Sequence, residues 1–308
     1  MTHALDAALG RAERGVLLYG ITPPRLATAP ERADEIAQRT LGRLAGVGLD
    51  ALVVYDVDDE SERAEVDRPF PFTPMMDPGE FADRHLAGWR EPFVVYRAVG
   101  KYAPADLGRR LVSADPRRTL TVLVGASTRE RPVRTSLADA YRLHREVSPA
   151  LGVGAVLIAE RHAGRGDEHE RMLDKQARGA QFFVSQICYD LDHTRNLLSD
   201  YAYTCRSRGR APAPVVVTLA PCGSTKTLEF MDWLGVEVPR WVRNDLQYGE
   251  NPLEESYDQC VAAARVLIAF CRKLSLPFGI NVESVTNRKV EIEASVELAR
   301  EVRGLLGH

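Results

Sequence analysis

Short runs of apolar residues recur along the chain, and a segment with helical periodicity follows most of them. The runs are continuously apolar, which is typical of parallel strands that are buried on both faces. We predict eight strands, at 16–19, 51–55, 93–96, 120–124, 153–158, 182–185, 215–219 and 278–282. Amphipathic helices are predicted at 33–44, 168–178, 191–206 and 253–274.

This alternation of strands and helices predicts an α/β fold with a parallel sheet. Eight strands in a chain of 308 residues favour a (β/α)8 TIM barrel, and an open doubly wound sheet is the alternative. The glycine pair Gly46 and Gly48 precedes a strand, so we interpret it as a turn rather than a dinucleotide-binding loop. No linker divides the chain, and we expect residues 1–308 to form one catalytic barrel domain.

The composition is that of a soluble globular enzyme, with 45% hydrophobic and 27% charged residues. Because the chain has 40 basic and 43 acidic residues, it has no excess of positive charge. We therefore expect a small-molecule ligand rather than a nucleic acid. No apolar run is long enough for a membrane span, and no signal peptide is recognisable, so we expect a cytoplasmic protein. The sequence leaves a homo-oligomer open.

In a barrel of this kind the chemistry follows the carboxyl ends of the strands. Asp56 directly follows the second predicted strand, and Glu160 and His162 follow the fifth. A carboxyl group that is buried there has a raised pKa and can act as a general acid, whereas the alternative is a solvated loop. The wider cluster at 160–170 lacks the spacing of a zinc motif, so we predict no metal site.

Polar residues end three further strands. Gln186 carries both a donor and an acceptor, which suits an amide-bearing heterocycle, but the residues alone favour a simple polar cap on a buried strand. Ser224 and Thr225 open a helix whose free N–H groups can hold an anion, or they simply cap that helix. Arg288 follows the eighth strand and can pair with a carboxylate or phosphate, or it belongs to a helix cap.

Five segments near these strand ends stand out: YGITPPR at 19–25, IAERH at 158–162, KQARGAQFFVSQICYD at 175–190, VEVPRW at 236–241 and TNR at 286–288. In this order they resemble the motifs of the methylenetetrahydrofolate reductase family over nearly the whole chain. The resemblance implies a TIM barrel that reduces 5,10-methylenetetrahydrofolate to 5-methyltetrahydrofolate in one-carbon metabolism and methionine biosynthesis. It also implies that Gln186 binds the pterin and that Tyr19 and Arg288 belong to the substrate site.

Three positions depart from the family pattern. Gly20 stands where the family has the glutamate that protonates the substrate. The segments 94–97 and 123–126 lack the family's flavin-contacting residues, and only Lys175 matches a phosphate-contacting position. We therefore expect no standard FAD site, and we expect NADH to pass its hydride directly to the folate. The sequence does not distinguish NADH from NADPH.

A reductase without the family glutamate needs another acid. The candidates are Glu160, Glu283 and Asp56, with Tyr55 as a positioning hydroxyl. The residues expected to contact the nicotinamide cofactor are Lys175, His162, Ser224 and Thr225. The alternative is a folate-binding barrel without reductase activity, either a folate-dependent methyltransferase or a folate-binding partner.

Overall fold

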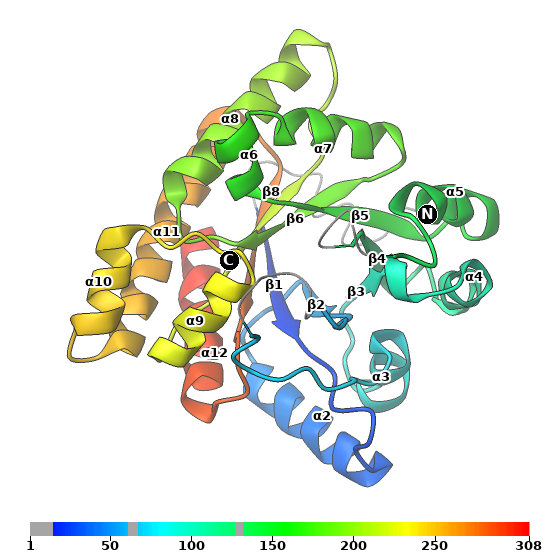
Figure 1. The fold of residues 1–308 in the computed structure, drawn as a ribbon, viewed down its shortest axis with the longest axis horizontal. Coiled ribbons are helices and arrows are strands. Elements are labelled where there is room, and N and C mark those ends of the chain that lie inside the picture. The colour runs from blue at the N-terminus through cyan, green and yellow to red at the C-terminus, as the bar shows by residue number, and fades with distance from the viewer. Residues whose placement is uncertain (1–14, 61–66, 127–131, 308) are drawn as a thin grey trace.

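The computed structural model describes residues 15–60, 67–126 and 132–307. Eight parallel strands close into one barrel in chain order, with β8 pairing to β1, and the helices surround them (Figure 1). The strands are β1 (Val16–Ile21), β2 (Ala51–Val54), β3 (Phe93–Ala98), β4 (Thr119–Val124), β5 (Gly152–Leu157), β6 (Phe182–Ile187), β7 (Val215–Leu219) and β8 (Phe278–Glu283). The predicted (β/α)8 barrel is confirmed.

The helices are α2 (Pro30–Leu44), α3 (Pro78–His85), α4 (Pro104–Ser113), α5 (Leu137–Val147), α6 (Ala159–Arg165), α7 (Glu168–Ala177), α8 (Leu191–Ser207), α9 (Thr225–Trp233), α10 (Arg240–Tyr248), α11 (Pro252–Leu274) and α12 (Lys289–Leu306). A short 3-10 helix, η2 (Val99–Lys101), follows β3. All four predicted helices are present. The first of them begins earlier than predicted, because a proline stands in its first turn, where the missing N–H costs nothing.

Alternate residues of each strand fill the inside of the barrel, and the others pack against the helices. The inner side chains include Val16, Leu18, Ala51, Val53, Val94, Tyr96, Leu120, Val122, Phe182, Val184 and Val216. At Gly154 a side chain has no room, because a Cβ atom would lie 2.5 Å from the Phe182 ring. The barrel interior is therefore a packed core, and a ligand can bind only at its mouth, beyond the carboxyl ends of the strands.

Gly46 and Gly48 both have a φ of 76°, the left-handed region that favours glycine. They turn the chain from the end of α2 into β2, which confirms the interpretation of this segment as a turn. Among the described residues, no helix combines the length and apolarity that crossing a membrane requires.

Candidate functional site

A half-buried carboxyl group marks the mouth of the barrel. Glu283 ends β8, and the Tyr55 hydroxyl at the end of β2 donates a hydrogen bond to its Oε2 atom. Asn281 Nδ2 donates to the Tyr55 hydroxyl at 2.9 Å and lies 3.3 Å from Glu283 Oε2. The Tyr55 ring packs edge-on against Tyr96 of β3, with 4.8 Å between the ring centroids. Side chains from β2, β3 and β8 therefore form one cluster, which we call the Glu283 cluster.

Gly20 of β1 makes this meeting possible. β1 lies between β2 and β8, and Gly20 is directly opposite Glu283 in the strand register. A Cβ atom at Gly20 would lie 2.7 Å from the Tyr55 ring and 3.0 Å from Glu283 Oε2. The space that a β1 side chain would fill is thus taken by side chains from the two neighbouring strands. A carboxyl group lies beside the position where the resemblance predicted one, but it comes from β8.

The protonation of this cluster follows from its burial. Burial raises the pKa of Glu283 to about 7, against the hydrogen bonds from Tyr55 and Asn281, which lower it. Burial, and then the charge of Glu283, raises the pKa of Tyr55 well above its ordinary value. At neutral pH a fraction of Glu283 therefore carries a proton that it can donate, while Tyr55 stays neutral.

A second carboxyl group, Glu160, lies in a cavity of about 260 Å³ together with Gln186 and Leu234. Glu160 Oε1 accepts a hydrogen bond from the backbone N–H of Glu237 at 3.4 Å. Its other oxygen is buried and has no hydrogen-bond partner among the described residues. Burial raises the pKa of Glu160. The Gln186 amide donates to the Leu234 carbonyl at 3.1 Å, so a ligand in this cavity would have to replace that contact.

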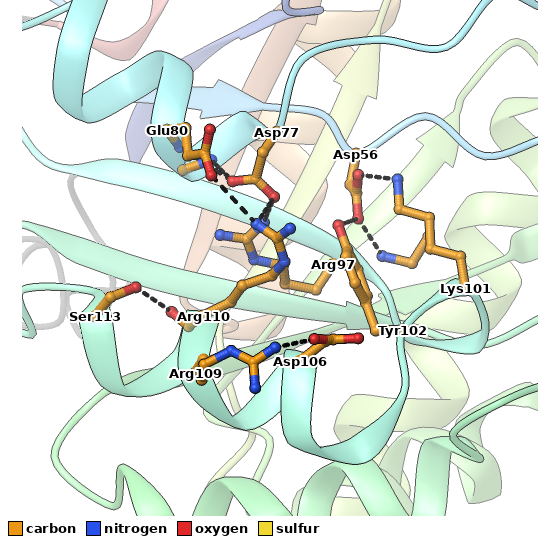
Figure 2. Close-up of polar contacts among 12 residues, drawn as sticks. Asp56, Asp77, Glu80, Arg97, Lys101, Tyr102, Asp106, Arg109, Arg110 and Ser113 are labelled. Atoms are coloured by element: carbon orange, nitrogen blue, oxygen red, sulfur yellow. Dashed lines mark hydrogen bonds and ion pairs between the residues drawn. The ribbon is translucent and has the colours of Figure 1, made fainter. Parts of the chain in front are cut away.

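Asp56, in contrast, is fully engaged by the protein (Figure 2). Lys101 forms an ion pair with it, the Tyr102 hydroxyl donates at 2.7 Å, and the backbone N–H of Ala98 donates at 2.9 Å. Its side chain is only 2% exposed. The structure thus corrects our interpretation of Asp56 as a candidate acid, because this carboxylate anchors η2 to the end of β2.

The start of α9 is bonded in part to other groups of the protein. Ser224 caps the helix by accepting a hydrogen bond from the Thr227 backbone N–H at 3.2 Å, and Thr225 is exposed. The Thr227 hydroxyl donates to the carboxylate of Glu291, which is fully buried, at 2.7 Å. A carboxylate of the protein therefore lies beside the segment to which we assigned a ligand phosphate. Of the two interpretations of Ser224, the helix cap is the one that the structure contains.

Arg288 belongs to the same arrangement. Its Nη1 atom donates to the Gly223 carbonyl and to Glu291, each at 3.2 Å. Thr286, from the loop after β8, also donates to Glu291. Nothing in the sequence near Arg288 pointed to Glu291, because a glutamate in the first turn of a helix is common and usually exposed.

Two other predicted site residues lie outside the barrel wall. The Tyr19 hydroxyl hydrogen-bonds Ser295 of α12 at 2.6 Å, between the barrel and its helices. The Lys175 ammonium donates to the Val156 carbonyl at 2.6 Å and is largely buried. Neither side chain lies with the Glu283 cluster, so the structure does not bring them to a ligand at the mouth.

His162, on α6, also lies outside the barrel wall. Its Nε2 atom is 3.0 Å from Asp200 Oδ2 on α8, and its ring packs edge-on against His169, with 5.3 Å between centroids. Of the predicted site residues, the structure therefore groups Tyr55 with Glu283, and Glu160 with Gln186.

The fold and this mouth define a (β/α)8 barrel with two half-buried carboxyl groups, Glu283 and Glu160, with which no cation of the described residues pairs. An uncharacterized protein from Clostridium thermocellum, solved as binding two copies of 5-methyl-5,6,7,8-tetrahydrofolic acid, is 37% identical to this chain. The match covers 97% of this chain and 99% of that one, with a TM-score of 0.86. The chain belongs to the same family as that protein.

Two more distant solved structures match the chain with lower similarity. Dihydropteroate synthase from Xanthomonas albilineans is 14% identical over 95% of this chain and 94% of its own, with a TM-score of 0.45. A 2,3-dimethylmalate lyase is 12% identical over 90% of this chain and 79% of its own, with a TM-score of 0.48. At these values neither bears on function. No protein-family model and no curated protein matches the chain.

Proposed function

We propose that this protein binds a reduced folate at the mouth of its barrel and reduces 5,10-methylenetetrahydrofolate to 5-methyltetrahydrofolate with a nicotinamide as hydride donor. The folate part rests on the Clostridium relative, which binds 5-methyltetrahydrofolate and is 37% identical over almost the full length. The reductase part rests on one observation, the protonatable carboxyl of Glu283 beside Gly20.

The chemistry needs one proton and one hydride. The proton goes to the nitrogen that leaves the methylene bridge, the bond between that nitrogen and the methylene carbon breaks, and the other nitrogen forms an iminium. The hydride then adds to the iminium carbon, which becomes the methyl group. Glu283 supplies the proton and is reprotonated from solvent, and Tyr55 holds its carboxyl group in place. Because the iminium is a strong electrophile, hydride transfer needs mainly an oriented approach.

The cavity around Glu160 and Gln186 suits the pterin ring. A pterin presents neighbouring N–H donors and a carbonyl acceptor on one edge. The unpartnered oxygen of Glu160 can accept from such donors, and the Gln186 amide can donate and accept. In this proposal Glu160 binds and orients the folate, while Glu283 donates the proton.

The residues present do not fit an FAD site. Lys175, the retained phosphate-contacting match, is largely buried and bonded to Val156. Arg97, in the segment that replaces a flavin motif on β3, is 5% exposed and pairs with Asp77 at 2.7 Å outside the barrel (Figure 2). We therefore derive no step through a flavin. A nicotinamide donor remains a prediction. We do not assign its phosphates to the start of α9, beside which Glu291 lies, or to His162, which pairs with Asp200.

The test combines an absorption spectrum with an oxidation assay. We expect purified protein to be colourless and to oxidise NADH or NADPH only when methylenetetrahydrofolate is present, without added flavin. The Glu283→Gln variant should lose about 100-fold or more in turnover, within the usual range for a general acid, and should still bind 5-methyltetrahydrofolate. Exposed Glu229 on α9 provides the matched control, Glu229→Gln, which should be fully active.

Other outcomes would change the proposal. Full activity of Glu283→Gln would exclude Glu283 as the acid, and a bound flavin would exclude direct hydride transfer. If 5-methyltetrahydrofolate binds but no nicotinamide is oxidised, even with added FAD, the chain is a folate-binding barrel or a methyltransferase. That alternative is compatible with the relative's ligand, since 5-methyltetrahydrofolate is both the product of the reductase and a methyl donor.

A further inference from the structure

We propose that His162, His169 and Asp200 form a binding site for one divalent metal ion, most suited to Zn²⁺, on the outside of the barrel. One ligand atom from each side chain lies within 4.8 Å of the other two. One pair, His162 Nε2 and Asp200 Oδ2, is 3.0 Å apart. Ligand atoms around a tetrahedral zinc ion lie about 3.3–3.6 Å apart, as follows from its bond lengths. Small side-chain rotations would therefore complete the site.

The two imidazoles have unused nitrogens. His162 is 6% exposed, and the Nδ1 atoms of both His162 and His169 are buried without a hydrogen-bond partner among the described residues. A neutral imidazole has one N–H and one lone pair, and a buried lone pair without a donor is destabilising. In this site His162 would bind the ion through Nε2, the atom beside Asp200, and His169 would bind it through Nδ1, which has no partner of its own in the described part of the chain.

The donor set determines the class of metal. Two imidazole nitrogens and one carboxylate oxygen suit Zn²⁺ and similar borderline ions rather than Ca²⁺ or Mg²⁺, which prefer oxygen ligands. Glu170 lies 3.7 Å from His169 Nε2, but Arg208 already holds it at 2.8 Å, so we do not count it as a ligand. Three protein ligands leave the fourth position to water. Asp200 is 55% exposed, which gives an ion access from solvent.

The fold explains why these groups meet. α6 ends at Gly166, whose φ of 71° reverses the chain into α7, so His162 and His169 are brought ring against ring. α8 packs against both helices and brings Asp200 to them (Figure 1). The sequence contains no zinc spacing, because the third ligand comes from a separate helix. This proposal departs from our expectation of no metal site at 160–170.

Such an ion would join α6 to α7 and α8. α6 begins at Ala159, directly after β5, and its second residue is Glu160 in the mouth cavity. The metal would therefore fix the helix that carries one of the two half-buried carboxyl groups. The site itself does not depend on the proposed folate function, and the experiment below tests it without any folate.

The experiment uses the full chain without a histidine tag, stripped of metal with a chelator and titrated with Co²⁺ as the spectroscopic probe. We expect one Co²⁺ per chain, with the intense visible absorption of a tetrahedral site. The His169→Gln and Asp200→Asn variants should each lower the affinity at least tenfold. His85 on α3 pairs with Asp34 at 2.7 Å, so His85→Gln is the matched control and should bind Co²⁺ like the wild type.

A second measurement keeps the test decisive. Zn²⁺ should raise the Tm of the wild type and of His85→Gln, but not of His169→Gln, because an ion that binds only the folded chain stabilises it. Circular dichroism shows whether each variant is folded. If His169→Gln does not fold, the exposed Asp200→Asn variant replaces it in both measurements. The proposal is overturned if the wild type shows neither tetrahedral Co²⁺ absorption nor a Zn²⁺-dependent Tm. It is equally overturned if the folded variants bind Co²⁺ as tightly as the wild type does.

Discussion

The Glu283 cluster predicts how the stability of this protein depends on pH. Burial raises the pKa of Glu283 from 4.5 to about 7, so the folded chain holds this proton more tightly than the unfolded chain does. The corresponding stabilisation is fully present below pH 4.5 and is lost as the pH rises through 7. The shift corresponds to about 3 kcal/mol at 1.36 kcal/mol per pKa unit, an upper value because the mouth is partly open to solvent.

The Glu283→Gln substitution removes this titration and keeps a side chain of the same shape. The amide can accept a hydrogen bond from Tyr55 through its oxygen, as the carboxyl group does. We therefore expect the free energy of unfolding of the wild type, relative to Glu283→Gln, to fall by about 2–3 kcal/mol between pH 4.5 and pH 8. Above pH 7.5 the variant should be the more stable protein, because the wild type must then bury a charge.

The assay is urea unfolding of both proteins at half-unit intervals from pH 4.5 to pH 8, followed by fluorescence and circular dichroism. Glu229→Gln on the exposed side of α9 is the control, and its curve should run parallel to that of the wild type. Parallel curves for Glu283→Gln and the wild type would refute the reasoning, since they would mean that Glu283 has the same pKa in the folded and unfolded chains.

Two further substitutions test the mouth. Gly20→Ala places a methyl group 2.7 Å from the Tyr55 ring, so it should separate Tyr55 from Glu283 and cost about 1–3 kcal/mol in urea unfolding. Unchanged stability and turnover would show that this close approach does not matter. Gln186→Ala should weaken the binding of 5-methyltetrahydrofolate about tenfold in calorimetry, as expected for a lost hydrogen bond to a buried ligand. The exposed Gln38→Ala change should leave that affinity unchanged, and equal affinities in both variants would remove Gln186 from the site.

The barrel could be predicted because its strands are buried on both faces and read as separate apolar runs. The face of the strand on which a residue lies could also have been predicted from the sequence. Successive strand residues alternate between the two faces, so Tyr19 and Gly20 cannot both face the interior. Leu18 lies in the inner core, which places Gly20 inward and Tyr19 outward. Applying the alternation to β1 would have removed Tyr19 from the candidates.

The partners of a polar residue could not be predicted in the same way. Asp56 and Glu283 both follow apolar strands in the sequence. Yet Lys101 and Tyr102 bind Asp56, whereas Tyr55 and Asn281 bind Glu283. The difference depends on which loop folds back over each strand end. Loop conformation depends on contacts between distant segments, and the pattern of one segment does not contain them.

The buried carboxylate of Glu291 has a consequence for how the barrel is closed. The barrel closes where its last strand, β8, pairs with its first, β1. The loops after β7 and β8 lie beside this strand pair. Glu291 accepts hydrogen bonds from Gly223 and Thr227, in one loop and its helix, and from Thr286 in the other loop, so contacts within the protein join the two loops. Ligands therefore meet a rim that is already ordered on this side, and less of their binding energy is used to order it.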